Sequence, residues 1–392
     1  MYELLATLKG ARNAVISTSF SPQARFIAAV GYGGISVWDL ETYKNLPISS
    51  DNVYNHRNPD NVYTACAWLH FEHADRYLLI IGSQKGTLST LNWDNETKSF
   101  EPSLQVPPEG SPHQVLSIDV YQAEVPLGRL ARIAVATADN RATVYSLSPF
   151  GDLQEIFSSV VENFSLVAAR FCKKNRDVYV FELNGGGISL LDAKTGNVKS
   201  THKYGPDPMG TVCLDDSSKF FVACTGKDFE MFRLENIEHV QTFSGELPIV
   251  LFPKVATYAE DGSVLVVGTD RGHASIFNVS DGDKIQDLPY TTTGLVQSVA
   301  AITARDGFLV AIAGSTLHSR AEVLIFKKSH ASLDKSRDNQ AMDLLDAVAP
   351  RSTLQSYLLL IIGSFLVING LYSLVLMCNS WVCLSSISYL NI

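Results

Sequence analysis

Charge is scarce in this chain and is absent from its C-terminal end. Asp, Glu, Lys and Arg make up 18% of the 392 residues, below the roughly 25% that is usual in soluble domains. Residues 352–392 contain none of these and no His, and within them residues 357–378 are almost entirely apolar. A helix over 357–378 would be roughly 33 Å long, enough to cross a hydrocarbon core about 30 Å thick. The sequence therefore predicts one transmembrane helix at 357–378 and a short far-side tail at 379–392.

A secretory signal peptide is also lacking, because the N-terminus has no charged region followed by a long apolar stretch. We therefore expect residues 1–356 to lie in the cytosol and the protein to be tail-anchored in a cytosol-facing membrane, with the endoplasmic reticulum as one candidate. The lipid bilayer would be contacted through 357–378. A misassigned end of the coding sequence is the alternative explanation for the uncharged tail.

Motifs for catalysis and for metal or cofactor binding are missing. No Gly-rich motif is followed by Lys-Ser or Lys-Thr, and no Ser lies in a nucleophile elbow. His70 and His73 lie at the boundary of a predicted strand and a turn, so they do not share a helical face that could hold a metal. The six cysteines show no CxxC pair and no metal-ligand spacing. We expect no catalytic residue, no cofactor and no metal site, and hence not an enzyme.

The charge that is present is predominantly acidic. The formal net charge is −9, and the uncharged tail contributes nothing to it. An acidic surface repels phosphate backbones, so we expect no nucleic acid among the partners.

What the chain does have is an internal repeat. Its first module reads VISTSF, FIAAV and ISVWDL, three apolar strands separated by turns that contain Pro or Gly. The same order recurs six more times, and a period of this length is typical of a β-propeller. The third strand of each module carries a large apolar residue at one aligned position, at intervals of 41 to 54 residues: Trp38, Leu91, Tyr145, Leu191, Phe232, Phe277 and Phe326. We expect these seven side chains to be buried, and Trp93, two residues out of this register, to be peripheral.

The ends of the repeat predict how the ring closes. No fourth strand follows Phe326, because the next residues are polar, whereas residues 2–8 form an apolar strand without a partner of their own. Pairing that strand with the last module would remove two open sheet edges. The predicted fold is therefore all-β: a seven-bladed β-propeller at 1–328 closed by the N-terminal strand, a polar linker at 329–356, and the transmembrane α-helix at 357–378.

The repeat resembles the WD-repeat family of β-propellers, most clearly in LLATLKG and FSPQARFIAAVGYGGISVWDLET of the first module. The resemblance covers roughly residues 2–328, and its motifs are divergent. Gly10-Ala11 stands where the family has Gly-His, and the family's polar tetrad is reduced to Thr137 with Asp139 and Thr269 with Asp270. The resemblance implies a rigid ring that binds other proteins through the loops on one face, here held together by hydrophobic packing.

Two connections on that face are unusually long, 52–63 and the Pro-rich 106–113. Aromatic residues and Arg are frequent energetic anchors of interfaces, so the first connection predicts a partner-binding site at Tyr54, His56, Arg57 and Tyr63. A solvent-facing loop without a partner is the alternative interpretation.

The leading functional hypothesis is a noncatalytic protein–protein interaction scaffold. The alternative is a nucleotide-exchange regulator of a small GTPase at the endoplasmic reticulum, because a cytosolic propeller followed by one C-terminal span resembles the membrane exchange factor that begins coat assembly there. That family carries a long Gly-rich insertion in its first blade, whereas the first module here turns tightly through Gly31, Tyr32, Gly33 and Gly34.

Overall fold

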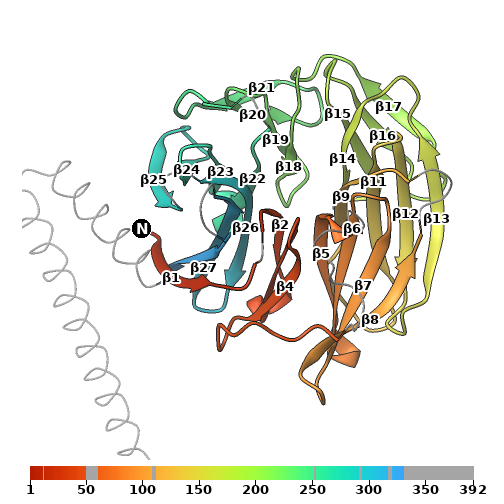
Figure 1. Ribbon diagram of the computed structural model, residues 1–392. Coiled ribbons are helices and arrows are strands. Elements are labelled where there is room, and N and C mark those ends of the chain that lie inside the picture. Colours follow the sequence, from red (N-terminus) through yellow and green to blue (C-terminus); the bar gives the residue numbers. More distant parts are fainter. Residues whose placement is uncertain are drawn as a thin grey trace, which may run out of the picture. The chain divides into compact units, whose positions relative to one another are not determined.

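The computed structural model describes residues 1–330, except residues 12, 50–60, 108–111, 251–252, 291–293 and 317–319. Within these residues the chain forms seven β-sheets arranged around a ring (Figure 1), which is a seven-bladed β-propeller. The predicted fold class is thereby confirmed for this part of the chain. We number the blades by the order in which their innermost strands occur in the sequence.

The strands follow the predicted repeat. Blade one contains β2 (Val15–Phe20), β3 (Phe26–Gly31) and β4 (Gly34–Asp39), and blade two contains β5 (Tyr63–Phe71), β6 (Arg76–Ser83), β7 (Leu88–Asp94), β8 (Ser99–Val106) and the short parallel strand β10 (Glu124–Val125). Blade three contains β9 (Val115–Val120), β11 (Ala131–Thr137), β12 (Arg141–Leu147) and β13 (Leu153–Val160), and blade four contains β14 (Leu166–Phe171), β15 (Val178–Glu182), β16 (Ile188–Leu191) and β17 (Val198–His202).

The second half of the ring repeats this order. Blade five contains β18 (Val212–Leu214), β19 (Phe220–Cys224), β20 (Phe229–Arg233) and β21 (His239–Phe243). Blade six contains β22 (Ala256–Ala259), β23 (Val264–Gly268), β24 (His273–Asn278) and β25 (Lys284–Pro289), and blade seven contains β26 (Leu295–Ala304), β27 (Gly307–Ser315), β28 (Val323–Ser329) and β1 (Glu3–Leu8). Single 3₁₀ turns are present at η1 (Pro22–Ala24), η3 (Glu72–Ala74) and η4 (Glu260–Gly262).

The N-terminal strand closes the ring as predicted. β1 pairs antiparallel with β28, with Leu8 opposite Val323 and Leu4 opposite Phe326. Leu8 is 1% exposed and lies in the apolar cluster shared by blades one and seven. A second attachment comes from Tyr2. Its backbone N–H donates to Gln286 Oε1, and Gln286 Nε2 donates to its backbone carbonyl, at 2.8 Å each. Tyr2 and β1 therefore link blade seven to blades one and six.

The aligned apolar position is structurally equivalent around the ring. In six blades, the pairing of the third strand with the fourth shifts by one residue beside the aligned position. The aligned residues in these blades are Leu91, Tyr145, Leu191, Phe232, Phe277 and Phe326. Trp38 of blade one makes a single bridge to Asn45, because blade one has three strands among the described residues. Six of the seven side chains are buried, as predicted, whereas Tyr145 is partly exposed.

Trp93 is not peripheral, so this prediction was wrong. The side chain is 6% exposed, and its ring centroid lies 5.0 Å from that of Phe26 in blade one and 5.0 Å from that of Phe100. The physical reason is the period of a β-strand, which places residues two apart on the same face. Leu91 and Trp93 therefore both face blade one, within the apolar cluster that blades one and two share.

Hydrogen bonds between innermost strands supplement the apolar contacts between blades. Thr18 bonds through its hydroxyl and its amide to the Ser298 hydroxyl, at 2.8 Å each. Further bonds of this kind run from the Trp68 indole N–H to the Ser19 carbonyl, from Thr64 to the Val115 carbonyl, from the Ala169 amide to Ser117, from the Phe171 amide to Asp119, and from Arg170 to the Val212 carbonyl. The expectation that packing alone holds the ring is therefore incomplete.

No helix among the described residues is long and apolar enough to cross a membrane. The predicted span at 357–378 and the tail at 379–392 lie outside the described residues, as does the linker from residue 331 onward.

Candidate functional site

Of the four predicted partner-binding residues, the structure describes Tyr63. Tyr54, His56 and Arg57 lie outside the described residues. Tyr63 is the first residue of β5 and is 8% exposed, within the apolar cluster between blades one and two. Burial also raises the pKa of its hydroxyl. The expected position of Tyr63 on an exposed loop is corrected, because strand pairing begins at this residue and directs its side chain into the core.

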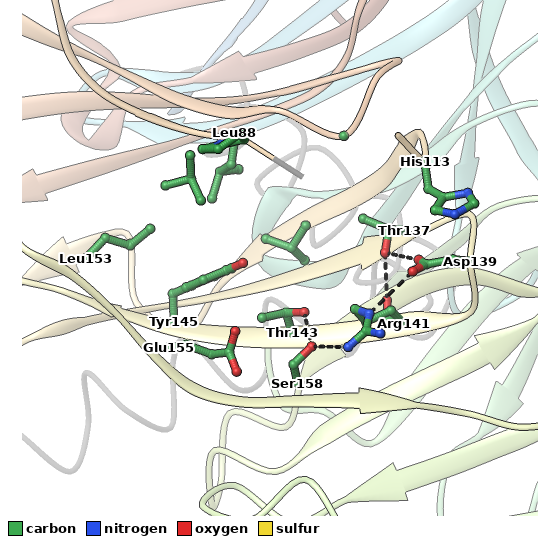
Figure 2. Close-up of a pocket in the computed structure, with 14 residues that line it drawn as sticks. Leu88, His113, Thr137, Asp139, Arg141, Thr143, Tyr145, Leu153, Glu155 and Ser158 are labelled. Atoms are coloured by element: carbon green, nitrogen blue, oxygen red, sulfur yellow. Dashed lines mark hydrogen bonds and ion pairs between the residues drawn. The ribbon is translucent and has the colours of Figure 1, made fainter. Parts of the chain in front are cut away.

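A cavity of about 250 Å³ lies between blades two and three. We call it the 2/3 groove. Its floor is the β11–β12 hairpin with β13, and its opposite wall comes from Leu88, Val106 and Pro107. Figure 2 shows His113, Asp139 and Arg141 at one end and Leu153 at the other. The groove is therefore polar at one end and apolar at the other, and the ends of the predicted long connection 106–113 contribute to it.

Strand periodicity explains why these side chains share one face. Arg141, Thr143 and Tyr145 alternate along β12 and so point to the same side of the sheet. Opposite them on β11, Thr137 pairs with Arg141 and Val135 pairs with Thr143. The bulge between β12 and β13 brings Ser158 and Glu155 opposite Thr143 and Tyr145.

The polar end of the groove is held by a small network. The Thr137 hydroxyl donates to Asp139 at 2.5 Å, and Arg141 donates from Nε to the same carboxylate at 3.3 Å. Arg141 Nη1 donates to the Ser158 hydroxyl at 3.0 Å, and Ser158 lies 2.9 Å from the Thr143 hydroxyl. A guanidinium group has five N–H donors, and these contacts use two of them while fixing its orientation.

Asp139 is ionised in this network. Burial alone would raise the pKa of its carboxyl group, but hydrogen bonds from Thr137 and Arg141 and the nearby charge of His113 outweigh burial. The pKa therefore lies below its ordinary value. The pairing of Thr137 with Asp139 was predicted from the sequence, whereas His113 was missed. Pro112 precedes His113 at the position where a Gly would have completed the Gly-His signal.

A second surface is formed by the connection from β21 to β22, which we call the 244–250 segment. Leu247, Ile249 and Val250 are 68%, 66% and 44% exposed. The β17–β18 connection, like the β21–β22 connection, joins a fourth strand to the next first strand and so leaves the ring on the same face; it carries Tyr204, which is 92% exposed. The exposed apolar side chains of the 244–250 segment therefore lie on the loop face, the face that the sequence resemblance predicts to bind partners.

Polar contacts hold the backbone of this segment. Arg271 donates to the Leu247 carbonyl at 2.7 and 3.1 Å and pairs with Glu246 at 3.0 Å. Asp270 accepts a hydrogen bond from the Val250 amide at 2.7 Å. Its carboxylate is 4% exposed and lies 3.5 Å from the Lys254 ammonium group.

The pKa of Asp270 reflects these contacts. Burial alone would raise it, but the Val250 amide and the charge of Lys254 outweigh burial and hold it below its ordinary value. The segment is therefore attached to blade six through an ionised carboxylate.

The described residues contain no group of three or more His, Cys, Asp and Glu side chains placed to hold a metal ion. His70 lies in β5 and His73 in η3, as expected for a strand followed by a turn, and His70 Nε2 lies 3.2 Å from Asp75.

Burial raises the pKa of the Cys66 and Cys213 thiols to about 12. Such thiols stay protonated at neutral pH and are poor nucleophiles and poor metal ligands.

Comparison with protein-family models gives no match, and comparison with curated proteins gives none either. What the structure itself establishes is the seven-bladed propeller with repeated blades.

Proposed function

We propose that this protein is a noncatalytic scaffold that binds other proteins through the loop face of its propeller. The observation that carries the proposal is the 244–250 segment, where exposed Leu247, Ile249 and Val250 are fixed to blade six by Asp270 and Arg271. Scattered exposed apolar residues are ordinary. Apolar anchors that are held in place before binding lose little conformational entropy when a partner docks.

The propeller is proposed to be a divergent member of the WD-repeat type. The resemblance in blade one is supported by the burial of Trp38, whose indole N–H donates to the Lys9 carbonyl at 3.0 Å. In blade three, His113, Thr137 and Asp139 come together at the positions where that family has its polar tetrad.

The membrane attachment is proposed from the sequence. The apolar run 357–378 is long enough to span a bilayer, and the proposed orientation places the propeller in the cytosol. A scaffold anchored in this way would hold its partners close to a membrane surface.

Cross-linking of the full-length protein in cells tests the proposed function. The change is Leu247→Ser together with Ile249→Ser, which removes two apolar anchors and leaves the contacts of Asp270 and Arg271 with the backbone intact. We expect the yield of a specific cross-linked partner to fall about tenfold or more, as for anchor residues in other interfaces.

The matched control is Val198→Ser with Ile285→Ser, which removes two apolar side chains that are 54% and 51% exposed on the outer strands β17 and β25. This control should leave the partner yield unchanged. Equal loss in both double variants, or no partner with the wild-type protein, would contradict the scaffold proposal.

Nucleotide exchange on a small GTPase has less support. β3 and β4 are joined by Tyr32 and Gly33 alone, where the resembling exchange factors have a long insertion. We keep exchange as the second candidate only because of the shared order of a propeller followed by an apolar run.

A further inference from the structure

The chain leaves the ring on the face opposite the loop face, which we call the exit face. Neighbouring strands within a blade are antiparallel, so the first and third strands of each blade run from the loop face to the exit face. β28 is the third strand of blade seven and ends at Ser329. The chain therefore continues from the exit face toward the apolar run at 357–378.

Blade three presents three apolar side chains on the exit face. Leu127 and Leu130, in the β9–β11 connection, are 69% and 57% exposed, and Phe150, in the β12–β13 connection, is 85% exposed. The strand ends that border these connections pair with each other, Ala131 with Leu147, so the two connections lie side by side. The equivalent connections of blades five and six, which the structure describes in full, carry no large exposed apolar side chain.

Hydrogen bonds hold both connections of blade three in place. The Ala123 carbonyl accepts a bond from the His70 amide at 2.8 Å, and β10 extends the sheet of blade two. In the other connection, the Ser148 hydroxyl accepts bonds from the amides of Phe150 and Asp152 at 3.2 and 3.1 Å. Apolar side chains on turns fixed in this way lose little conformational entropy when they dock.

Basic residues of blade four adjoin blade three, its neighbour in the ring (Figure 1). Lys173 Nζ donates to the carbonyls of Val120 and Tyr121 at 2.7 and 2.9 Å. The Arg176 guanidinium group lies 5.4 Å from the centroid of the Tyr121 ring, and Lys174 is exposed. Apolar and basic side chains therefore share one surface. We call it the 3/4 surface and define it by its four connections, 121–130, 148–152, 172–177 and 192–197.

The charge of the 3/4 surface differs from that of the neighbouring part of the exit face. Its connections carry five cationic side chains, Arg129, Lys173, Lys174, Arg176 and Lys194, and four carboxylates, Glu124, Asp152, Asp177 and Asp192. Lys199 pairs with the last two carboxylates at 2.9 and 3.1 Å. The equivalent connections of blades five and six carry Lys219 and eight carboxylates: Asp215, Asp216, Glu235, Glu238, Glu260, Asp261, Asp281 and Asp283. An anionic surface is therefore repelled at blades five and six much more than at blades three and four.

We propose that the 3/4 surface docks on an anionic lipid bilayer. Leu127, Leu130 and Phe150 enter the interfacial layer, and Arg129 and Lys174 meet the lipid phosphates. Apolar and aromatic side chains beside basic residues are typical of interfacial membrane contacts. The inference rests on the proposed membrane attachment, because the anchor follows the strand that ends on this face. Docking would turn the loop face, with the 244–250 segment, away from the bilayer and toward cytosolic partners.

The test places one added tryptophan on each face of the full-length protein. Phe150→Trp puts an indole on the 3/4 surface, and Tyr204→Trp puts one on the loop face. Each protein is reconstituted into vesicles of phosphatidylcholine and phosphatidylserine with brominated or unbrominated acyl chains, and the wild-type fluorescence is subtracted. We expect bromination to lower the Phe150→Trp signal about twofold or more, because interfacial side chains lie roughly 5–10 Å into the bilayer. The Tyr204→Trp signal should not change.

The contribution of charge is tested in the Phe150→Trp background. Arg129→Glu with Lys174→Glu should abolish most of the quenching, because each basic residue near an anionic surface strengthens binding about fivefold. The matched control is Lys203→Glu with Lys227→Glu, which reverses two exposed lysines in loop-face connections and should leave the quenching unchanged. Circular dichroism should show that all variants are folded.

Two results would overturn the proposal. One is equal quenching of Phe150→Trp and Tyr204→Trp. The other is quenching of Phe150→Trp that persists in full after Arg129→Glu with Lys174→Glu. Absence of any quenching would also overturn it and would leave an acidic protein as the occupant of the 3/4 surface.

Flotation of the same vesicles separates this inference from the proposed anchor. If the wild-type protein floats with the vesicles but Phe150→Trp is not quenched, the anchor stands and only the docking proposal fails. If the wild-type protein does not float, both fail, because docking would itself hold the protein on the vesicles. The cross-linking experiment with Leu247 and Ile249 tests the scaffold function independently of either result.

Discussion

Trp93 and Phe26 join blades one and two through a group of stacked and edge-on rings. Phe26 lies 5.8 Å from Trp68 and 5.4 Å from Phe100, measured between ring centroids, and all four rings are buried. Aromatic contacts of this geometry add to the free energy of burial. Trp93 is therefore one of the four rings on which the interface between blades one and two depends, although it lies two residues out of the repeat register.

We expect Trp93→Ala to destabilise the propeller by about 3–5 kcal/mol, the usual range for removing a buried aromatic side chain. The measurement is the urea midpoint of unfolding, followed by tryptophan-independent circular dichroism. Tyr204→Ala is the control, because Tyr204 is 92% exposed and surface substitutions usually change stability by about 0.5 kcal/mol or less. Equal midpoints for the two variants would show that Trp93 is not part of the core.

Asp270 predicts a pH dependence of the 244–250 segment. Its pKa in the folded protein is lowered from the ordinary value of 3.8, so the ionised form stabilises the attached segment at pH values above 3.8. That stabilisation is lost as the pH falls below 3.8 and through the lowered pKa. We expect hydrogen exchange of the Val250 amide, corrected for its intrinsic pH dependence, to accelerate in this acid range.

Asp270→Asn serves as the control for that measurement. An amide oxygen can still accept the Val250 N–H but does not titrate, so the acid-induced acceleration should disappear in this variant. Acceleration of the same size in both proteins would assign the pH effect to another group.

At the scale of whole elements, β1 is the strand on which ring closure depends. Deleting residues 1–9 would remove β1, expose the backbone edge of β28 and remove the bond between Tyr2 and Gln286. An exposed strand edge promotes aggregation. We expect the midpoint of thermal unfolding to fall by several degrees, or the protein to aggregate, as monitored by circular dichroism and light scattering. Unchanged melting would mean that β28 closes the ring without β1.

The strands were predictable because their signals are local. Alternating apolar residues, turns rich in Gly and the unpaired N-terminal strand identified the blades, the closure and the aligned position marked by Phe277. The burial of Trp93 was missed because it depends on Phe26, which belongs to a different blade. Strand period alone shows that Leu91 and Trp93 share a face, but not that the neighbouring blade covers both.

The candidate surfaces were predictable only in part. The connection 106–113 was singled out by its length and does border the 2/3 groove. The exposure of Leu247 and Ile249 could not be read from the sequence, because a short apolar run favours a strand or a core position. Arg271 and Asp270, which lie 24 and 20 residues further along the chain than their partners Leu247 and Val250, bind the backbone of the segment.

At the scale of the whole molecule, the propeller and the C-terminal apolar run imply different locations for one chain. The described ring carries its exposed apolar residues on loops and outer strands, whereas residues 357–378 carry none of the charge that the ring has. A loop face that binds partners and a run that enters a bilayer would together fix those partners near a membrane.

The membrane anchor is tested by alkaline carbonate extraction of cell membranes that contain either the full-length protein or a chain that ends at Arg351. An apolar run of about 20 residues inserts stably because its backbone is satisfied within the helix and its side chains leave water. We therefore expect the full-length protein to stay in the membrane pellet and the shortened chain to be released. Arg351 would lie on the cytosolic flank, in agreement with the tendency of basic residues to stay on that side. Release of both proteins would show that 357–378 does not anchor the chain, and the proposed scaffold would then act without a membrane.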